Sequence, residues 1–273
     1  MDTNDLYTKA KKLVATRNES GISRVFADSL IIGHRNLILL SRFSAVTVSV
    51  VLIPIMFLSG FLLTFERLMA AQEINYVQYL VPIITLQAMF FTAMGAAINL
   101  ATDIKAGMLQ RCRAMPISRV AAFGGLLIAY IVRASIALAI LVCFAHVYGF
   151  RFQGGWFSVV GFIALTLLFT TTAIAGYAVL ALGLKEPNLV QSLSIIPYAP
   201  LLLLSTGFSP AENFPHWLQA IVRGQPVSHT ANALRALVNG NEILNPLFWS
   251  VGWLLGLLLI FVFLAVYLYQ KVS

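Results

Sequence analysis

The sequence predicts an all-α integral membrane protein with six transmembrane helices, and three observations support this fold class. Of its 273 residues, 59% are hydrophobic and only 10% are charged, whereas about a quarter of the residues of a soluble domain are charged. The mean hydropathy is +0.86. Several uncharged apolar runs are long enough to cross about 30 Å of hydrocarbon at about 1.5 Å per residue. This composition excludes a soluble globular domain, a disordered chain and a disulfide-rich scaffold.

Six apolar runs are predicted to span the membrane as helices, because a backbone in lipid must satisfy its own hydrogen bonds. They are Ser44–Phe65, Val77–Thr102, Val120–Tyr148, Trp156–Leu184, Asn188–Phe208 and Leu247–Gln270. Only the third run contains a charged residue, Arg133. The fourth and fifth runs are joined by the very short turn Lys185-Glu186-Pro187. Prolines inside three of the runs predict local kinks.

The distribution of Lys and Arg predicts the orientation of these spans. Thirteen basic residues fall on the side that holds the N-terminus, the connection between spans two and three, Lys185 and Lys271, and only four on the other side. Cytoplasmic loops carry the excess of Lys and Arg, so we expect both termini in the cytoplasm. The net charge of +8 is then explained by anionic headgroups at the inner surface, without a nucleic-acid partner.

The chain divides into four predicted parts. Residues 1–22 form a cytoplasmic tail, and residues 23–43 form an amphipathic helix in the headgroup layer. That helix carries a narrow charged stripe, which includes Arg24, Asp28 and Arg35, on an otherwise apolar cylinder; an ordinary helix packed against the bundle is the alternative. Residues 44–270 form the six-helix transmembrane domain, and residues 271–273 form the cytoplasmic C-terminus.

The segment between the last two spans, residues 209–246, is predicted to be external. Its sequence indicates two short helices of a re-entrant type, since such helices can enter a leaflet where protein covers their ends. The first follows the turn Asn213–Trp217. The second is predicted over Ser228–Val238, with Ser228 as the N-cap and Gly240 as the C-terminal stop.

No pattern of catalytic or metal-binding residues is found in the sequence. It lacks G-x-x-x-x-G-K-[ST], G-x-S-x-G, H-E-x-x-H and C-x-x-C. The four histidines have no carboxylate or thiol at the spacing of metal ligands. We therefore expect a protein that is not an enzyme, has no metal site, binds no cofactor itself and cannot bind ATP by the P-loop mechanism.

A few polar residues within the spans are candidates for a transport pathway. Arg133 lies near the middle of the third span, where an ionisable side chain normally faces the bundle interior or a hydrated cavity. It is either a cation lining the pathway or a structural hydrogen-bonding residue. Gln87, Asn99 and Thr171 are the other candidates; the alternative is that such groups bond within or between helices and serve packing.

Two stretches of the sequence resemble the ABC-2 type permease subunits of ATP-binding-cassette exporters. Residues 103–118, DIKAGMLQRCRAMPIS, are similar to the family's cytoplasmic motif, although Met108 and Gln110 replace its usual Thr and Glu. The external stretches GFSP, FPHWL, QPVS and ALRAL, within residues 207–237, are similar to the segment before the family's last helix. Within the family, the pattern resembles the daunorubicin-resistance type, including its mycobacterial relatives that export complex lipids.

The resemblance implies a half-transporter in the bacterial plasma membrane. Two permease subunits, identical or paralogous, would form the pathway, and separate nucleotide-binding subunits would hold ATP and Mg²⁺. The cytoplasmic loop would dock into the ATPase as a coupling helix, with candidate residues Asp103, Lys105, Gly107, Arg111, Arg113 and Pro116. The candidate residues of the external motif are Phe214, Pro215, Trp217, Gln225, Pro226 and Arg235.

The expected cargo is a hydrophobic or amphipathic molecule, either a drug or a complex lipid, because the spans offer few polar groups. Export of a polysaccharide or teichoic-acid-like polymer is an alternative within the same fold, and would call for aromatic platforms, of which the sequence shows no clear set. A secondary carrier would need buried carboxylates and inverted repeats. A membrane-embedded lipid enzyme would need paired catalytic side chains at one depth. Neither feature is evident in the sequence.

Overall fold

The computed structural model describes residues 52–64, 76–107, 119–240 and 243–271, with the backbone alone for residues 119–126 and 269–271. All the regular elements within these ranges are helical. They are the helix Leu52–Thr64 and the labelled helices α4 (Tyr76–Lys105), α6 (Arg119–Val147), α7 (Gly155–Leu184), α8 (Pro187–Leu203), η2 (Ala211–Asn213), α9 (His216–Gly224), α10 (Pro226–Asn239) and α11 (Leu244–Lys271).

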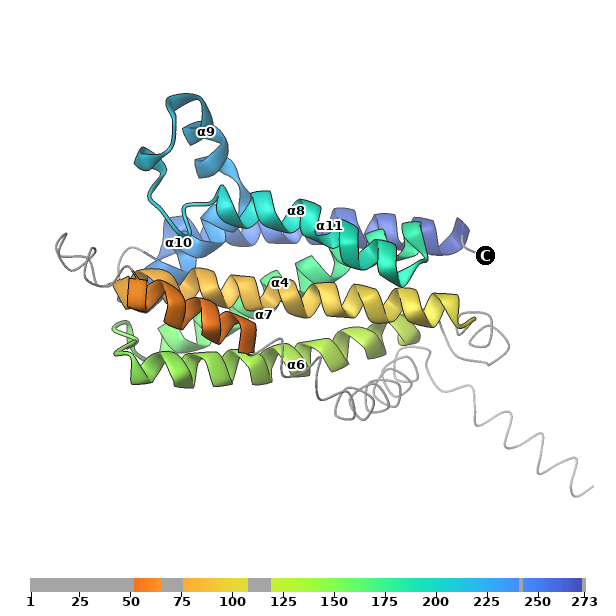
Figure 1. Cartoon of the computed structure of the whole chain (residues 1–273), viewed down its shortest axis with the longest axis horizontal. Helices are drawn as coiled ribbons and strands as arrows, with labels where there is room; N and C mark the ends of the chain where they lie inside the picture. Colours follow the sequence, from red (N-terminus) through yellow and green to blue (C-terminus); the bar gives the residue numbers. More distant parts are fainter. Residues whose placement is uncertain (1–51, 65–75, 108–118, 241–242, 272–273) are drawn as a thin grey trace, which may run out of the picture.

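The long helices α4, α6, α7, α8 and α11 lie side by side, and successive helices run in opposite directions (Figure 1). The bundle therefore has two ends. At one end, here called the α10 end, the backbone N–H of Gln153 donates to the carbonyl of Val238 at 2.8 Å, joining the α6–α7 connection to α10. At the opposite end, the Glu186 end, lie the C-terminus of α4 and the α7–α8 turn.

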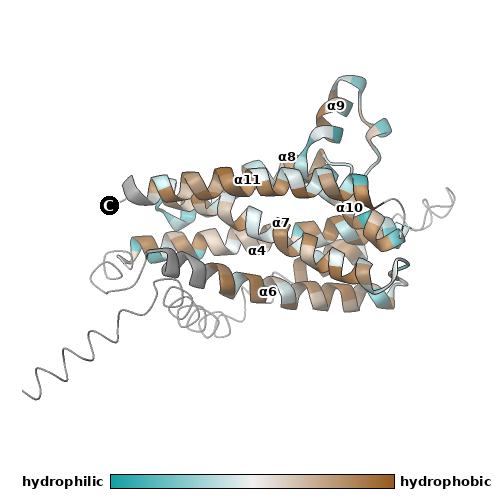
Figure 2. Ribbon diagram, turned by 180° about the vertical axis from the view of Figure 1, so that it is seen from behind, coloured by the Kyte–Doolittle hydropathy of each residue, from teal (hydrophilic) through white to brown (hydrophobic). Residues whose placement is uncertain are grey.

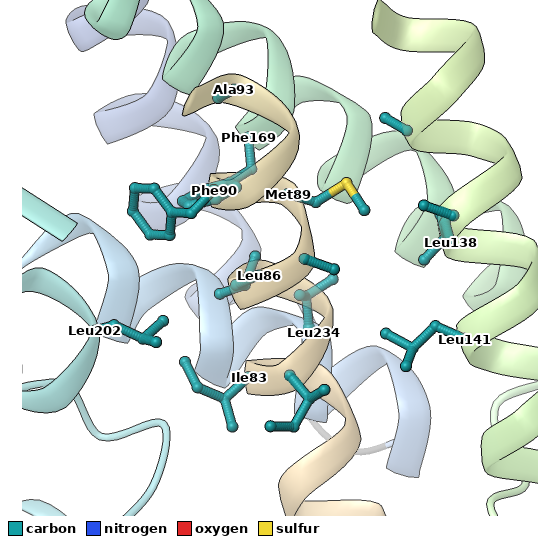
Figure 3. Packing of buried hydrophobic residues seen from close by; sticks show 14 of the residues in the cluster. Ile83, Leu86, Met89, Phe90, Ala93, Leu138, Leu141, Phe169, Leu202 and Leu234 are labelled. Carbon is teal, nitrogen blue, oxygen red and sulfur yellow. The ribbon is translucent and has the colours of Figure 1, made fainter. Parts of the chain in front are cut away.

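Helix α4 forms the centre of the bundle. Most of its residues are apolar, and 20 of its 30 residues are buried, as expected for a helix surrounded by other helices. Figure 3 shows its side chains meeting residues from four neighbouring helices. The contributors from α4 are Ile83, Leu86, Met89, Phe90 and Ala93, and those from α6, α7, α8 and α10 are Leu138, Leu141, Phe169, Leu202 and Leu234.

The outer surface of the bundle is apolar where lipid would contact it. Apolar residues follow the length of α11 and α6 (Figure 2). Only 11% of the most hydrophobic window of α11 is buried, and Phe263 and Leu259 are largely exposed. A large exposed apolar surface of this kind is stable in hydrocarbon and not in water, so the arrangement is that of an integral membrane protein.

Within the described ranges, four helices are long and apolar enough to cross a membrane: α4, α7, and the segments Leu127–Val147 of α6 and Leu244–Leu268 of α11. Their bounds agree with the second, third, fourth and sixth predicted spans to within a few residues. Of the first predicted span, Leu52–Thr64 is helical. Its beginning, Ser44–Val51, lies outside the described residues, as do the cytoplasmic tail 1–22, the amphipathic helix 23–43 and the stretch 108–118 with Arg111, Arg113 and Pro116.

The fifth predicted span is shorter than its apolar run suggests. Helix α8 has 17 residues, about 25 Å at about 1.5 Å per residue, and ends at Leu203, whereas the prediction extended to Phe208. Pro197 and Pro200 remove two backbone donors from its second half. The chain then turns through residues 204–208, where Gln225 bonds the Leu204 carbonyl and Arg235 of α10 bonds the carbonyls of Thr206 and Gly207.

The two predicted short helices between the last spans are present as α9 and α10, and α9 stands out from the bundle (Figure 1). The predicted start of the second helix at Ser228 is wrong. Gln225 is the N-cap in an extended conformation, and Pro226 takes the first helical position, which its fixed φ favours. The predicted stop at Gly240 is confirmed, because Gly240 is the C-cap with φ 70°.

Candidate functional site

The described part of the predicted coupling segment ends α4. Asp103 and Lys105 lie in the last turn of that helix, and Gly107 follows with φ 70°. Lys105 Nζ lies 2.7 Å from Glu186 Oε1, so this residue of α4 is paired with the α7–α8 turn. Sequence reasoning missed Glu186. The signal was its opposite charge on the same predicted side of the membrane as Lys105.

The α7–α8 turn contains only Lys185 and Glu186, and its geometry is fixed on both sides. Lys185 adopts φ 58° in the left-handed region and donates its N–H to the Ala181 carbonyl at 2.9 Å, which closes α7. Glu186 is extended, and its carbonyl accepts the Val190 N–H at 3.0 Å, which opens α8. Pro187 at the first helical position completes a compact connection.

Arg133 lies between α6 and α4, where its side chain is only 5% exposed. Its guanidinium carbon is 5.9 Å from the centre of the Tyr130 ring, and Nη1 passes 3.9 Å from where a β-carbon on Gly95 would be. The Asn99 amide donates to the Tyr130 oxygen, and the Tyr130 hydroxyl donates to the Gly95 carbonyl at 3.2 Å. Tyr130, which sequence reasoning missed, thus brings the predicted residues Arg133 and Asn99 together.

Gln87 belongs to a different group, between α4 and α8. Its Nε2 donates to the Tyr198 hydroxyl at 2.9 Å. The Phe90 ring lies edge-on to the rings of Phe169 at 5.0 Å and Tyr198 at 5.7 Å. The sequence alone shows no clear set of aromatic platforms. These rings pack against one another inside the bundle, so they form a core cluster and not an open platform on which a sugar could stack.

Five threonines of α4 and α7 bond a carbonyl of their own helix. Thr171 Oγ1 donates to the Leu167 carbonyl at 2.8 Å. The same bond to the fourth residue back is made by Thr85, Thr92, Thr170 and Thr172. This geometry is the helix-bonding alternative stated for the hydroxyls; a pathway role for Thr171 stays a prediction.

Arg235 joins three segments at the α10 end. From α10, its Nε donates to the Tyr79 carbonyl of α4 at 3.1 Å, and its Nη1 donates to the Thr206 carbonyl beyond α8 at 2.8 Å. Nη2 donates to the Gly207 carbonyl, and the guanidinium lies 3.6 Å from the centre of the Tyr79 ring. We call these contacts the Arg235 network.

Gln225 and Ser228 extend the network along the same turn. Gln225 Nε2 donates to the Leu204 carbonyl, and the Ser228 hydroxyl accepts the Thr206 N–H at 3.0 Å. Gly207 packs so closely on α4 that a β-carbon there would lie 2.2 Å from Ile83 Cδ1. Burial lowers the pKa of the Arg235 guanidinium to about 10, so it remains charged at neutral pH.

The remaining predicted residues of the external motif lie apart from the Arg235 network. Pro226 begins α10. Pro215 is the N-cap of α9, Phe214 accepts the Gln219 amide through its carbonyl, and Trp217 is 74% exposed. Sequence similarity thus selected one group that organises the end of the bundle and one that forms the exposed α9.

The arrangement as a whole is a bundle with an apolar interior and polar ends. Among the described residues, Arg133 is the one charged residue buried in the middle of the spans, whereas the guanidinium of Arg235 is enclosed at the α10 end of the bundle. Helix α8 is tied to α4 at one end by the Arg235 network and at the other by the Lys105–Glu186 pair. Such a structure can carry a change of helix packing from one membrane surface to the other.

Comparison with known proteins gives consistent matches. Residues 42–267 match a family described as ABC-2 family transporter protein. The chain is 33% identical over 255 residues to the daunorubicin resistance ABC transporter permease protein DrrB1 of Streptomyces coeruleorubidus, covering 91% of this chain and 89% of that protein. It is 27% identical over 184 residues to the probable doxorubicin resistance ABC transporter permease protein DrrC of Mycobacterium tuberculosis, covering 65% and 64%. It is also 25% identical over 279 residues to the putative transport permease ycf38 of Cyanophora paradoxa, covering 97% and 95%.

The family match covers most of the chain, and the first relative aligns over nearly its whole length. Together with the exposed apolar helices, these matches make the chain a multi-pass protein of the bacterial plasma membrane and a transport subunit that is not itself catalytic. The chain belongs to the ABC-2 family of transporter proteins.

Proposed function

We propose that this chain is the membrane subunit of an exporter that moves hydrophobic or amphipathic molecules outward, using ATP hydrolysed by a separate nucleotide-binding subunit. A second permease, either identical or paralogous, completes the pathway. The Glu186 end faces the cytoplasm and the α10 end faces outward. Six spans and cytoplasmic termini follow from the same assignment.

One observation carries the choice of cargo. The described interior contains no buried carboxylate, and its buried cations are Arg133 between the spans and the Arg235 guanidinium at the α10 end. Proton-coupled and ion-coupled carriers use buried acidic groups, whereas an apolar molecule needs only an apolar route with a few polar contacts. The names of the relatives, which refer to daunorubicin and doxorubicin resistance, support planar amphipathic drugs as the first molecules to test.

The absence of a P-loop motif from the sequence supports a separate source of energy. The coupling segment after α4 is basic, with Arg111 and Arg113, and we assign it to the surface that docks on the nucleotide-binding subunit. Charge reversal at both arginines is expected to reduce co-purification of that subunit while the chain still inserts into the membrane. Unchanged co-purification would contradict this assignment.

The function is tested in inverted membrane vesicles that contain this chain and its nucleotide-binding subunit. We expect ATP-dependent uptake of doxorubicin, which is measured by the quenching of its fluorescence. Uptake should disappear when the P-loop lysine of the partner is replaced by alanine. Vesicles with the chain alone should neither hydrolyse ATP nor take up drug.

Two results would contradict the proposal. Robust ATP hydrolysis by the purified chain alone would remove the need for a partner. Uptake that follows a proton gradient and ignores ATP would indicate a secondary carrier. A comparison of doxorubicin, a fluorescent glycolipid and a lipid-linked oligosaccharide distinguishes drug or lipid export from polymer export.

A further inference from the structure

Helix α8 is held against the rest of the bundle unequally at its two ends. At the α10 end, Arg235 bonds the two carbonyls of Thr206 and Gly207 and the Tyr79 carbonyl of α4. At the Glu186 end, a single ion pair joins Glu186 to Lys105 of α4, with side-chain exposures of 35% and 58%. Exposed ion pairs are weak and are easily exchanged for water, so the Glu186 end is the one that can be released.

Glu186 is built into the start of α8. Its carbonyl accepts the Val190 N–H at 3.0 Å, and Pro187 follows it directly. On its other side, Lys185 is fixed by the bond to the Ala181 carbonyl of α7. A displacement of the Glu186 backbone relative to α4 therefore moves the first turn of α8, because Glu186 is bonded to that turn and is followed directly by its first residue.

Lys105 stands at the corresponding point on α4. It is the last residue of that helix, two positions before Gly107, and the coupling segment continues directly from it. Helix α4 is the buried centre of the bundle. A movement of the coupling segment therefore reaches the packed helices first at the C-terminal turn of α4.

The second half of α8 is suited to bending. Pro197 and Pro200 each remove a backbone hydrogen bond. On the N-terminal side of the prolines, the Tyr177 hydroxyl donates to the carbonyl of Ser194 at 3.1 Å. Ser194 lies three residues before Pro197 in the same helix. The first half of α8 can consequently tilt about the region of the prolines while the Arg235 network holds the far end.

We propose that Glu186 is a positioning residue for transport, and that the Lys105–Glu186 contact passes movement of the coupling segment to the first half of α8. The pair holds α8 against α4 in the state described here and opens when the nucleotide-binding subunit moves the segment. This inference rests on the proposed function, because it requires a partner that acts on residues 103–118.

The test is the number of ATP molecules hydrolysed per doxorubicin transported, measured in vesicles with the complete complex. Lys105→Glu and Glu186→Lys are each expected to raise this ratio about two- to fivefold, the range set by the strength of an exposed pair. The double variant, which exchanges the charges, should return the ratio close to the wild-type value. A structural role alone would lower the amount of complex without changing the ratio.

The chain contains a matched control at the other end of the bundle. Arg223 Nη2 lies 2.8 Å from Glu212 Oε1, and both side chains are exposed. Arg223→Glu and Glu212→Lys break a similar exposed pair of a basic residue and a glutamate, and they should leave the ratio unchanged. Equal effects of the two pairs, or no recovery in the double variant, would overturn the inference.

A cross-link provides a second measurement. With Cys112 and Cys143 replaced by serine, a short bis-methanethiosulfonate cross-linker that joins Lys105→Cys to Glu186→Cys, and so spans the length of the two original side chains, should stop ATP-dependent uptake, and reduction of its disulfides should restore it. Uptake that continues with the cross-link formed would show that the contact does not open. If the wild-type complex shows no ATP-dependent uptake at all, the proposed function fails. If the wild-type complex transports normally and these variants transport as well as it does, only the inference about Glu186 fails.

Discussion

Replacing Arg235 by alanine removes the side chain that joins α4, α10 and the turn after α8. The Gly207 carbonyl loses its side-chain donor, at a cost of about 1–2 kcal/mol. The Thr206 carbonyl keeps the Tyr79 hydroxyl at 2.9 Å and loses about 0.5–1 kcal/mol. Loss of the cation–π contact with Tyr79 adds about 0.5–1 kcal/mol. The expected destabilisation is thus about 2–4 kcal/mol.

In a chain of this size about 1 kcal/mol shifts the apparent Tm by about 2 °C, so the loss corresponds to a decrease of about 4–8 °C. Tryptophan fluorescence during heating in detergent measures it. Arg235→Lys should fall between wild type and alanine, because an ammonium cannot bond the same carbonyls in the planar geometry of a guanidinium. Arg223→Ala is the control, and should shift Tm little because its pair is exposed. An Arg235→Ala protein whose Tm lies within 2 °C of wild type would refute the reasoning, because 2 °C corresponds to only about 1 kcal/mol. An equal decrease in Tm for Arg223→Ala would also refute it.

Three further substitutions test other parts of the structure. Gly207→Ala should lower Tm by overpacking against Ile83, at a cost of about 1–3 kcal/mol, whereas Gly252→Ala, which meets open space, should not. Lys185→Gly should raise Tm slightly, since glycine relieves about 0.5–1 kcal/mol of left-handed backbone strain; a decrease would count against the turn geometry. Arg133→Ala should lower doxorubicin transport by a larger factor than it lowers the amount of chain in the membrane, and equal losses would favour a purely structural role.

The helices of the bundle were largely predictable, because the length of an uncharged apolar run sets the length of a helix in lipid. The end of α8 was not, since residues 204–208 remain apolar or small after the helix has stopped. Hydropathy cannot detect that Arg235 and Gln225 bond the carbonyls of that turn. The start of α10 was misplaced for a similar reason: Ser228 has the chemistry of an N-cap, but its hydroxyl is used by Thr206.

The candidate residues were predicted singly, and the structure supplies the partners. Asn99 and Arg133 were chosen for polarity at depth, and Tyr130 joins them. The Arg235 network consists mainly of bonds to backbone carbonyls, which every residue possesses, so the sequence contains no sign of them. The Lys105–Glu186 pair depends on the distance between two helix ends, which a sequence fixes only through the packing of the whole bundle.

The sidedness of the bundle tests the central claim most directly, because a nucleotide-binding subunit can act only on a cytoplasmic surface. Single cysteines at Lys185 and Glu212, at opposite ends of the bundle (Figure 1), are introduced with both native cysteines replaced by serine. A membrane-impermeant maleimide is then added to intact cells. The account predicts labelling of the cysteine at 212 in intact cells and of the cysteine at 185 only after permeabilisation. Labelling of the cysteine at 185 in intact cells would place the coupling segment outside and contradict the account.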